Sequence, residues 1–172
     1  MQRLLGAICI LTGCLGYGYS YIEREKQRIV YAGMWENIML MFLEEISFKK
    51  QSLALAAFEI GQRIGGREGE CFIRIYDKVI NQRQNGFADI WLGEWKAYYQ
   101  KRNLSVEEKK RIEEFADIIG FYDEKVQVKM IEELQNKWQN IRLDLIEEQR
   151  ERKKMVWTLS ACSGVMLILI LI

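Results

Sequence analysis

Glu44 and Glu45 are the first residues that could do chemistry, because a pair of carboxylates can share acid–base work on one substrate. Neighbouring residues of a helix point about 100° apart, so these two side chains cannot act on the same group. We therefore expect a solvated helix edge or ion pairs here. Glu45 is also a candidate for partner binding or a structural motif.

Cys71 is a second candidate, because Arg67 and Arg74 are close enough in sequence to stabilise a thiolate. The chain contains no histidine, which removes the usual base of a cysteine nucleophile and a favoured ligand of transition metals. We predict no active site, no metal site and no cofactor, so the protein is not expected to be an enzyme.

Gly65, Gly66 and Gly69 bear a loose likeness to a phosphate-binding loop. No Gly-Lys-Ser or Gly-Lys-Thr follows them, so the cation and the hydroxyl of such a loop are missing. Glycine commonly ends helices, and a turn between two helices is the favoured interpretation.

An aromatic set near the middle of the chain could form a docking surface, because Trp and Tyr are enriched in interface hot spots. It comprises Phe87, Trp91, Trp95, Tyr98 and Tyr99. Core packing is the other interpretation, and it is favoured for Trp91. Both interpretations stay open for Trp95 and Tyr99, which turn away from the core side of a helical wheel.

These residues belong to a region predicted to be all-α, a bundle of about six helices. The chain has no proline, and apolar residues recur at three- and four-residue steps. The expected helices cover residues 35–46, 53–64, 72–80 and 87–99, then the stretch from a capping box at Ser105 and Glu108 to Gly120, and a last helix from about residue 124.

Asp123 is predicted to cap this last helix, which is expected to continue through Lys154 into an apolar run. Its apolar positions alternate spacings of three and four over two heptads: Ile131, Leu134, Trp138, Ile141 and Leu145. This seam either packs within the bundle or pairs between copies, as in a coiled-coil signalling or assembly adaptor.

The two ends of the chain are apolar and predict membrane helices. Residues 4–22 and 155–172 carry no charge, and each run approaches the ~20 residues that span a bilayer. We predict transmembrane helices over residues 1–24 and 154–172. Basic clusters border both on their inner sides, so residues 25–153 are expected to be a cytosolic domain.

An alternative for the first run is a lipoprotein signal processed at Cys14, because Leu11, Thr12, Gly13 and Cys14 resemble a lipobox. It is disfavoured, since it would export the domain together with the basic cluster that precedes Met155.

Small residues within the two runs predict close helix packing, either within the chain or between copies in a homo-oligomer. They are Gly6, Gly13 and Gly16 in the first run and Ser160 and Gly164 in the second. The plainer interpretation is that small residues are common in membrane helices.

The charge balance argues against nucleic acid as a partner. Between Glu23 and Lys154, 24 Lys and Arg face 24 Asp and Glu. A domain that binds nucleic acid through its phosphates usually carries a marked basic excess.

The chain resembles the stage III sporulation protein AB family of endospore-forming bacteria. The likeness is carried by residues along the whole chain: Leu4-Leu5-Gly6-Ala7, Glu45-Ile46 with Leu53, Trp91 after Gly86, Ile119-Gly120 with Asp123 and Gln127, and Leu159 with Gly164. The family pattern usually has Thr-Pro-Leu at residues 51–53 and glycine at Ala116 and Ser160, so local turn geometry is expected to differ there.

The resemblance implies a scaffold in the channel complex between mother cell and forespore, in the mother-cell membrane facing the forespore. It implies a fold similar to the cytoplasmic domain of the type II secretion platform protein. The expected partners are the cytosolic ATPase stage III sporulation protein AA, other channel-complex proteins and the lipid bilayer. Asp123 and Gln127 match the family's polar pair, as a contact or as a structural motif.

Overall fold

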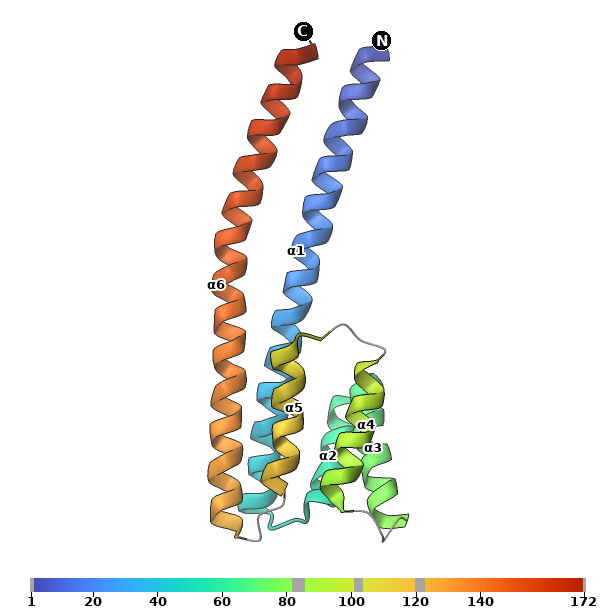
Figure 1. Cartoon of the computed structure of the whole chain (residues 1–172), viewed down its shortest axis with the longest axis vertical. Helices are drawn as coiled ribbons and strands as arrows, with labels where there is room; N and C mark the ends of the chain where they lie inside the picture. Colours follow the sequence, from blue (N-terminus) through green and yellow to red (C-terminus); the bar gives the residue numbers. More distant parts are fainter. Residues whose placement is uncertain (1, 82–85, 101–103, 120–122, 172) are drawn as a thin grey trace. The chain divides into compact units, whose positions relative to one another are not determined.

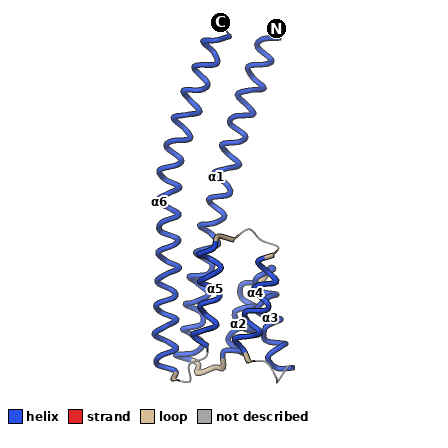
Figure 2. Tube along the Cα trace, viewed as in Figure 1, coloured by secondary structure: helices blue, strands red, loops and turns tan. Residues whose placement is uncertain are grey.

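The computed structural model describes residues 2–81, 86–100, 104–119 and 123–171; in its terminal helices it describes the backbone and a part of the side chains. These residues form helices and short connections, with no strand among them (Figures 1 and 2). The elements are α1 (Gln2–Leu43), η1 (Glu44–Phe48), α2 (Leu53–Ile64), α3 (Gly66–Asn81), α4 (Phe87–Tyr99), α5 (Val106–Ile119) and α6 (Glu124–Leu171). The prediction of an all-α protein is confirmed.

The chain divides into two compact units. The central unit is Met34–Gln139, and the terminal unit combines Met1–Gly33 with Asn140–Ile172. Within the central unit α2 contacts α3, α3 contacts α4 and α4 contacts α5. The helix predicted from residue 124 into the apolar run is confirmed as the single element α6.

Aromatic side chains fill the core of the central unit. Trp35 on α1 stacks on Trp138 on α6, with ring centroids 5.5 Å apart and planes inclined by 13°. The ring of Trp35 also meets Trp95 at 4.8 Å, and Trp91 meets Phe115 at 4.6 Å. Such pairs each contribute roughly 0.5–1.5 kcal/mol beyond the area they bury. The core therefore ties the first and last helices of this unit to α4 and α5.

The N-terminal caps predicted for α5 and α6 are both formed. Ser105 accepts a hydrogen bond from the Glu108 N–H at 3.1 Å, and the Ser105 N–H donates to Glu108 Oε2 at 2.7 Å, which makes a complete capping box before α5. Asp123 Oδ1 accepts from the Lys125 N–H at 2.8 Å and so caps α6.

The helix break predicted at three glycines is wrong at one of them. Gly65 and Gly66 have φ of 63° and 62°, which suits the turn between α2 and α3. Gly69 instead lies inside α3 and is buried, and a Cβ built on it would stand 2.5 Å from the carbonyl oxygen of Gly61 on α2. Gly69 is therefore a packing residue that lets two helix backbones approach closely.

Gly69→Ala is expected to destabilise the central unit by about 1–3 kcal/mol, because the new methyl meets backbone that cannot move aside. Urea unfolding of the intact chain in detergent, followed by Trp fluorescence, measures this change. Gly93→Ala is the matched control, since Gly93 is exposed inside α4 with nothing within 4 Å of its added Cβ. It should stabilise by about 0.5–1 kcal/mol. Equal effects of the two substitutions would contradict the close approach.

Ion pairs join neighbouring helices around partly buried carboxylates. Glu94 on α4 is paired with Arg74 at 3.0 Å and with Lys78 at 2.5 Å, both from α3. Burial acts to raise the pKa of Glu94, but the hydrogen bonds from Lys78 and Arg74 outweigh it and hold the pKa below its usual value. Glu114 is held low in the same way by Lys137 and Arg111.

Because the folded pKa of Glu94 is depressed, its contribution to stability is fully present above the ordinary value of 4.5 and is lost as the pH falls through the folded value. Glu94→Gln should therefore cost roughly 1.5 kcal/mol near neutral pH, and the loss should shrink below about pH 4.5. Urea unfolding over a pH series measures both. Glu70→Gln is the control, since Glu70 pairs with Arg74 at 3.9 Å while 71% exposed; it should change stability by less than about 0.5 kcal/mol at every pH.

The two segments of the terminal unit, one from α1 and one from α6, run antiparallel and contact each other at two places along their length. Arg152 Nη1 lies 3.7 Å from Glu25 Oε1, and a Cβ built on Gly33 would stand 3.2 Å from Cδ of Arg142. Among the residues whose side chains are described, no helix is both long and apolar enough to cross a membrane. Most residues of the two apolar runs lie outside that set, so the helices predicted over residues 1–24 and 154–172 stay a prediction.

Candidate functional site

The connection between α1 and α2, residues 44–52, is called the elbow, and its backbone is irregular. Residues Glu44–Phe48 form a π-helix, in which the Lys49 N–H reaches back five residues to the Glu44 carbonyl at 3.4 Å. Lys50 follows with φ of 55°, the only non-glycine residue with positive φ in the described part of the chain. Such a conformation costs about 1–3 kcal/mol, and π-turns concentrate at functional sites.

Glu45 is the electrostatic centre of the elbow, and its side chain is completely buried. Its Oε1 accepts from Lys49 Nζ at 2.7 Å and lies 3.1 Å from Arg63 Nη2 on α2. Its Oε2 has no hydrogen-bond partner among the described residues. Glu44, half exposed, pairs with the same two cations at 3.9 and 3.6 Å. The ion pairs predicted for this carboxylate pair are confirmed, and they fix the elbow to the end of α2.

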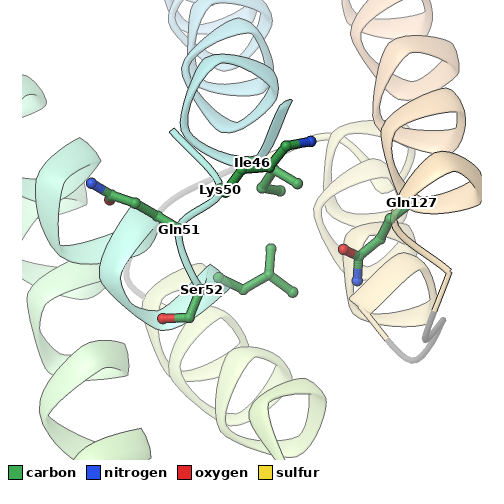
Figure 3. A pocket seen from close by; sticks show the side chains of 6 residues that line it. Ile46, Lys50, Gln51, Ser52 and Gln127 are labelled. Atoms are coloured by element: carbon green, nitrogen blue, oxygen red, sulfur yellow. The ribbon is translucent and has the colours of Figure 1, made fainter. Parts of the chain in front are cut away.

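A pocket of about 210 Å³ opens beside the elbow (Figure 3). Its lining residues are Ile46, Lys50, Gln51, Ser52, Leu53 and Gln127. Gln127 comes from the first turn of α6, and Figure 3 shows its amide directed toward the elbow. Ligand pockets usually measure about 300–1,000 Å³, so this volume suits a side chain of a partner protein better than a cofactor.

Cys71 lies in the core, and its surroundings disfavour the thiolate form. Burial raises the pKa of its thiol to about 12, and the nearby Arg74 only partly offsets this effect. Among the described residues no group of His, Cys, Asp or Glu could hold a metal ion. The elbow and its pocket are therefore taken as the candidate site on the described part of the central unit.

Known proteins share both the sequence pattern and the fold. A scan against protein-family models matches the family described as Stage III sporulation protein AB over residues 3–172. The chain belongs to the Stage III sporulation protein AB family. The resemblance noted from the sequence is thus confirmed. A search of curated proteins finds no match.

A solved structure described as Stage III sporulation protein AB has the same fold. The two chains superpose with a TM-score of 0.65 at 16% identity, over 73% of this chain and 98% of the other. The two proteins thus share a fold although few of their residues are identical.

The structure gives the two residues of the predicted polar pair different places. Asp123 is used as the cap of α6, whereas Gln127, one turn later, lines the pocket. Gln127, although far from the elbow in sequence, faces Ile46 across the pocket, and Ile46 directly follows the buried Glu45.

Trp95 and Tyr99 do not form an exposed aromatic surface. Trp95 is fully buried against Trp35, Phe72 and Trp91, and Tyr99 is only 8% exposed. The core interpretation is thus the correct one for both. The docking interpretation fails because α4 is covered by α3 and by α5, so two sides of this helix are buried instead of one.

The small residues predicted to pack in the membrane lie outside the residues whose surroundings are described. Gly6, Gly13 and Gly16 lie in α1, and Ser160 and Gly164 lie in α6. Their packing role stays a prediction.

Three features of the site carry no sequence signal. A π-turn has the same composition as an α-helix, and Lys50 is not a residue type that favours positive φ. The exposed aromatic ring of Phe48 also lies in η1, and only the structure shows that it projects from the elbow with 84% of its surface exposed.

Glu45→Gln is expected to destabilise the protein by about 3 kcal/mol, the lower end of the range for breaking a buried ion pair, because Lys49 and Arg63 keep access to water. Thermal unfolding of the intact chain in detergent measures the loss. Glu44→Gln removes the neighbouring, half-exposed carboxylate and should change stability by no more than about 0.5 kcal/mol. If both substitutions had the same small effect, Glu45 would not anchor the elbow.

Proposed function

We propose that this chain is a membrane-anchored, non-catalytic platform of the channel complex between mother cell and forespore, and that its central unit docks the cytosolic ATPase stage III sporulation protein AA. The observation that carries the proposal is the family match, which extends over residues 3–172 and so includes both apolar runs. In this proposal residues 25–153 face the cytosol of the mother cell, and the two runs lie in its membrane.

Exposed apolar side chains in α6 support the membrane anchor. Met155, Leu159 and Met166 are 60%, 63% and 67% exposed, although they belong to a run without charges. Large apolar side chains at this density are unfavourable in water and suited to lipid. Positive charge on the inner side of each run supports the cytosolic placement of the domain.

The elbow is the docking surface that the geometry favours. An aromatic ring that is 84% exposed, a neighbouring pocket of side-chain size and a strained backbone lie together there. Aromatic residues beside pockets are frequent hot spots of protein recognition. Ion pairs from Glu45 hold the elbow in one conformation, so binding does not have to order it.

The alternative of a coiled-coil adaptor finds less support. Ile131, Leu134 and Trp138 of the predicted seam are buried within the chain, and Trp138 stacks on Trp35. These side chains are therefore not available to pair with a second copy.

Phe48→Ser tests the docking role, because it removes the exposed ring without touching the core. The intact chain in detergent should lose affinity for the purified ATPase by about 10- to 30-fold, as for a hot-spot residue. Titration by microscale thermophoresis measures the dissociation constant, and spore counts measure the consequence in cells.

Val106→Ser is the matched control, since Val106 is also 84% exposed but lies at the start of α5. It should leave the affinity within about twofold. If Phe48→Ser binds as tightly as the unaltered chain, the ATPase docks elsewhere. If the unaltered chain does not bind the ATPase at all, the docking function itself is wrong.

A further inference from the structure

Five exposed cations border the apolar runs in the terminal unit, and they are called the basic collar. They are Lys26, Arg28, Arg150, Lys153 and Lys154. Among the described residues, no side chain forms an ion pair or hydrogen bond with any of these five cationic groups; the Thr158 hydroxyl donates only to the backbone carbonyl of Lys154, at 2.9 Å. Their charges are therefore free to meet an anion from outside the chain.

An ion pair shows that the collar residues of α1 and those of α6 lie at the same height along the two helices. Arg152 on α6 lies 3.7 Å from Glu25 on α1, and Glu25 is nearly buried. Arg152 thus points toward α1. Arg150, Lys153 and Lys154 are spaced by three and four residues, so they share the other side of α6. Lys26 follows Glu25 directly, so cations of α1 stand at the same level as those of α6.

Residues 23–154 have a net charge of zero, yet positive and negative charge are separated along them. Residues 23–28 and 150–154 hold seven Lys and Arg against three Glu, an excess of four positive charges. Residues 29–149 hold 17 Lys and Arg against 21 Asp and Glu, an excess of four negative charges. The two segments next to the apolar runs are therefore net positive, whereas the sequence between them is net negative as a whole.

The neighbouring residues indicate which anion the collar meets. Met155 and Leu159, exposed and apolar, follow Lys154 on α6 within about one turn. A surface that passes from apolar to cationic over such a short distance matches the boundary between acyl chains and headgroup phosphates. Nucleic acid and acidic proteins also carry negative charge, but they offer no adjoining apolar phase for Met155 and Leu159. A lipid surface therefore fits the collar better.

We propose that the basic collar binds anionic phospholipid headgroups and gives the protein a preference for anionic over zwitterionic lipid. The inference rests on the proposed membrane anchoring. To that proposed function it adds a class of lipid that the protein binds and the five residues that bind it. Because the attraction acts within about one Debye length, roughly 8 Å at physiological salt, it should weaken as salt is added.

Lipid selectivity of the reconstituted full chain tests the proposal. The protein is placed in phosphatidylcholine vesicles with spin-labelled phosphatidylglycerol or spin-labelled phosphatidylcholine, and the motionally restricted fraction of each label is measured by electron paramagnetic resonance. The unaltered chain should favour phosphatidylglycerol by at least about threefold at low salt, with a ratio near one at high salt. Both leaflets carry label, so the direction of insertion does not affect the ratio.

A five-fold variant removes the collar: Lys26→Gln, Arg28→Gln, Arg150→Gln, Lys153→Gln and Lys154→Gln. It should lose the preference for phosphatidylglycerol. The matched control neutralises five exposed cations of the central unit, Arg67→Gln, Lys96→Gln, Lys110→Gln, Lys125→Gln and Lys129→Gln, and so has the same net charge. It should keep the preference.

Three outcomes would overturn the proposal: equal affinity of the unaltered chain for both lipids, equal loss in both variants, or a preference that survives in the collar variant. Extraction of the vesicles with alkaline carbonate distinguishes these from failure of the proposed function. A chain that stays in the membrane without lipid preference refutes only the collar. A chain released by carbonate refutes the membrane anchor as well.

Discussion

The stacking of Trp35 on Trp138 is the contact on which the central unit depends. It joins α1 to α6, the first and last helices of the chain, and so closes the unit across the largest sequence separation in its aromatic core. Trp91 and Trp95 fill the adjoining space from α4, and the Trp91 indole donates a buried hydrogen bond to the Ile112 carbonyl at 2.8 Å. Rigid rings of this size admit few alternative packings, so the core specifies one arrangement of the helices around it.

That arrangement explains why the elbow can be both irregular and ordered. The π-turn and the positive φ of Lys50 are unfavourable by themselves, yet the segment is held between core residues such as Ile46 and the ion pairs of Glu45. The protein thus presents Phe48 and the pocket on a fixed support. Such a surface would suit the proposed platform function, because recognition of a partner is favoured when no ordering accompanies binding.

Periodicity and cap chemistry predict most of the fold from the sequence, because both are local. The apolar spacing of residues 53–64 and the capping box at Ser105 report on a single helix, and the structure agrees with both. The errors concern contacts between helices. Gly69 looks like a helix end, yet it is a packing residue whose role depends on the position of Gly61. The sequence leaves the exposure of Trp95 open, because the wheel of one helix does not show that α4 has a second neighbour that covers this residue.

The candidate site is less predictable for the same reason. Glu45 and Gln127 stand out in the sequence, but their proximity depends on the tertiary fold, and the conformation of Lys50 leaves no compositional trace.

The π-turn also carries a consequence for how this family can vary. A π-turn is an α-helix with one additional residue, and that residue is accommodated without disrupting the helix on either side. Loss of one residue within 44–48 would restore the regular repeat and turn the remaining residues of the elbow by about 100° relative to α1. Phe48 and the following loop would then face another direction, while the buried face of α1 before Leu43 stayed where it is. A deletion of one residue in this segment would therefore reorient the surface around Phe48 without changing any core residue, so the length of the elbow can vary separately from the composition of the core.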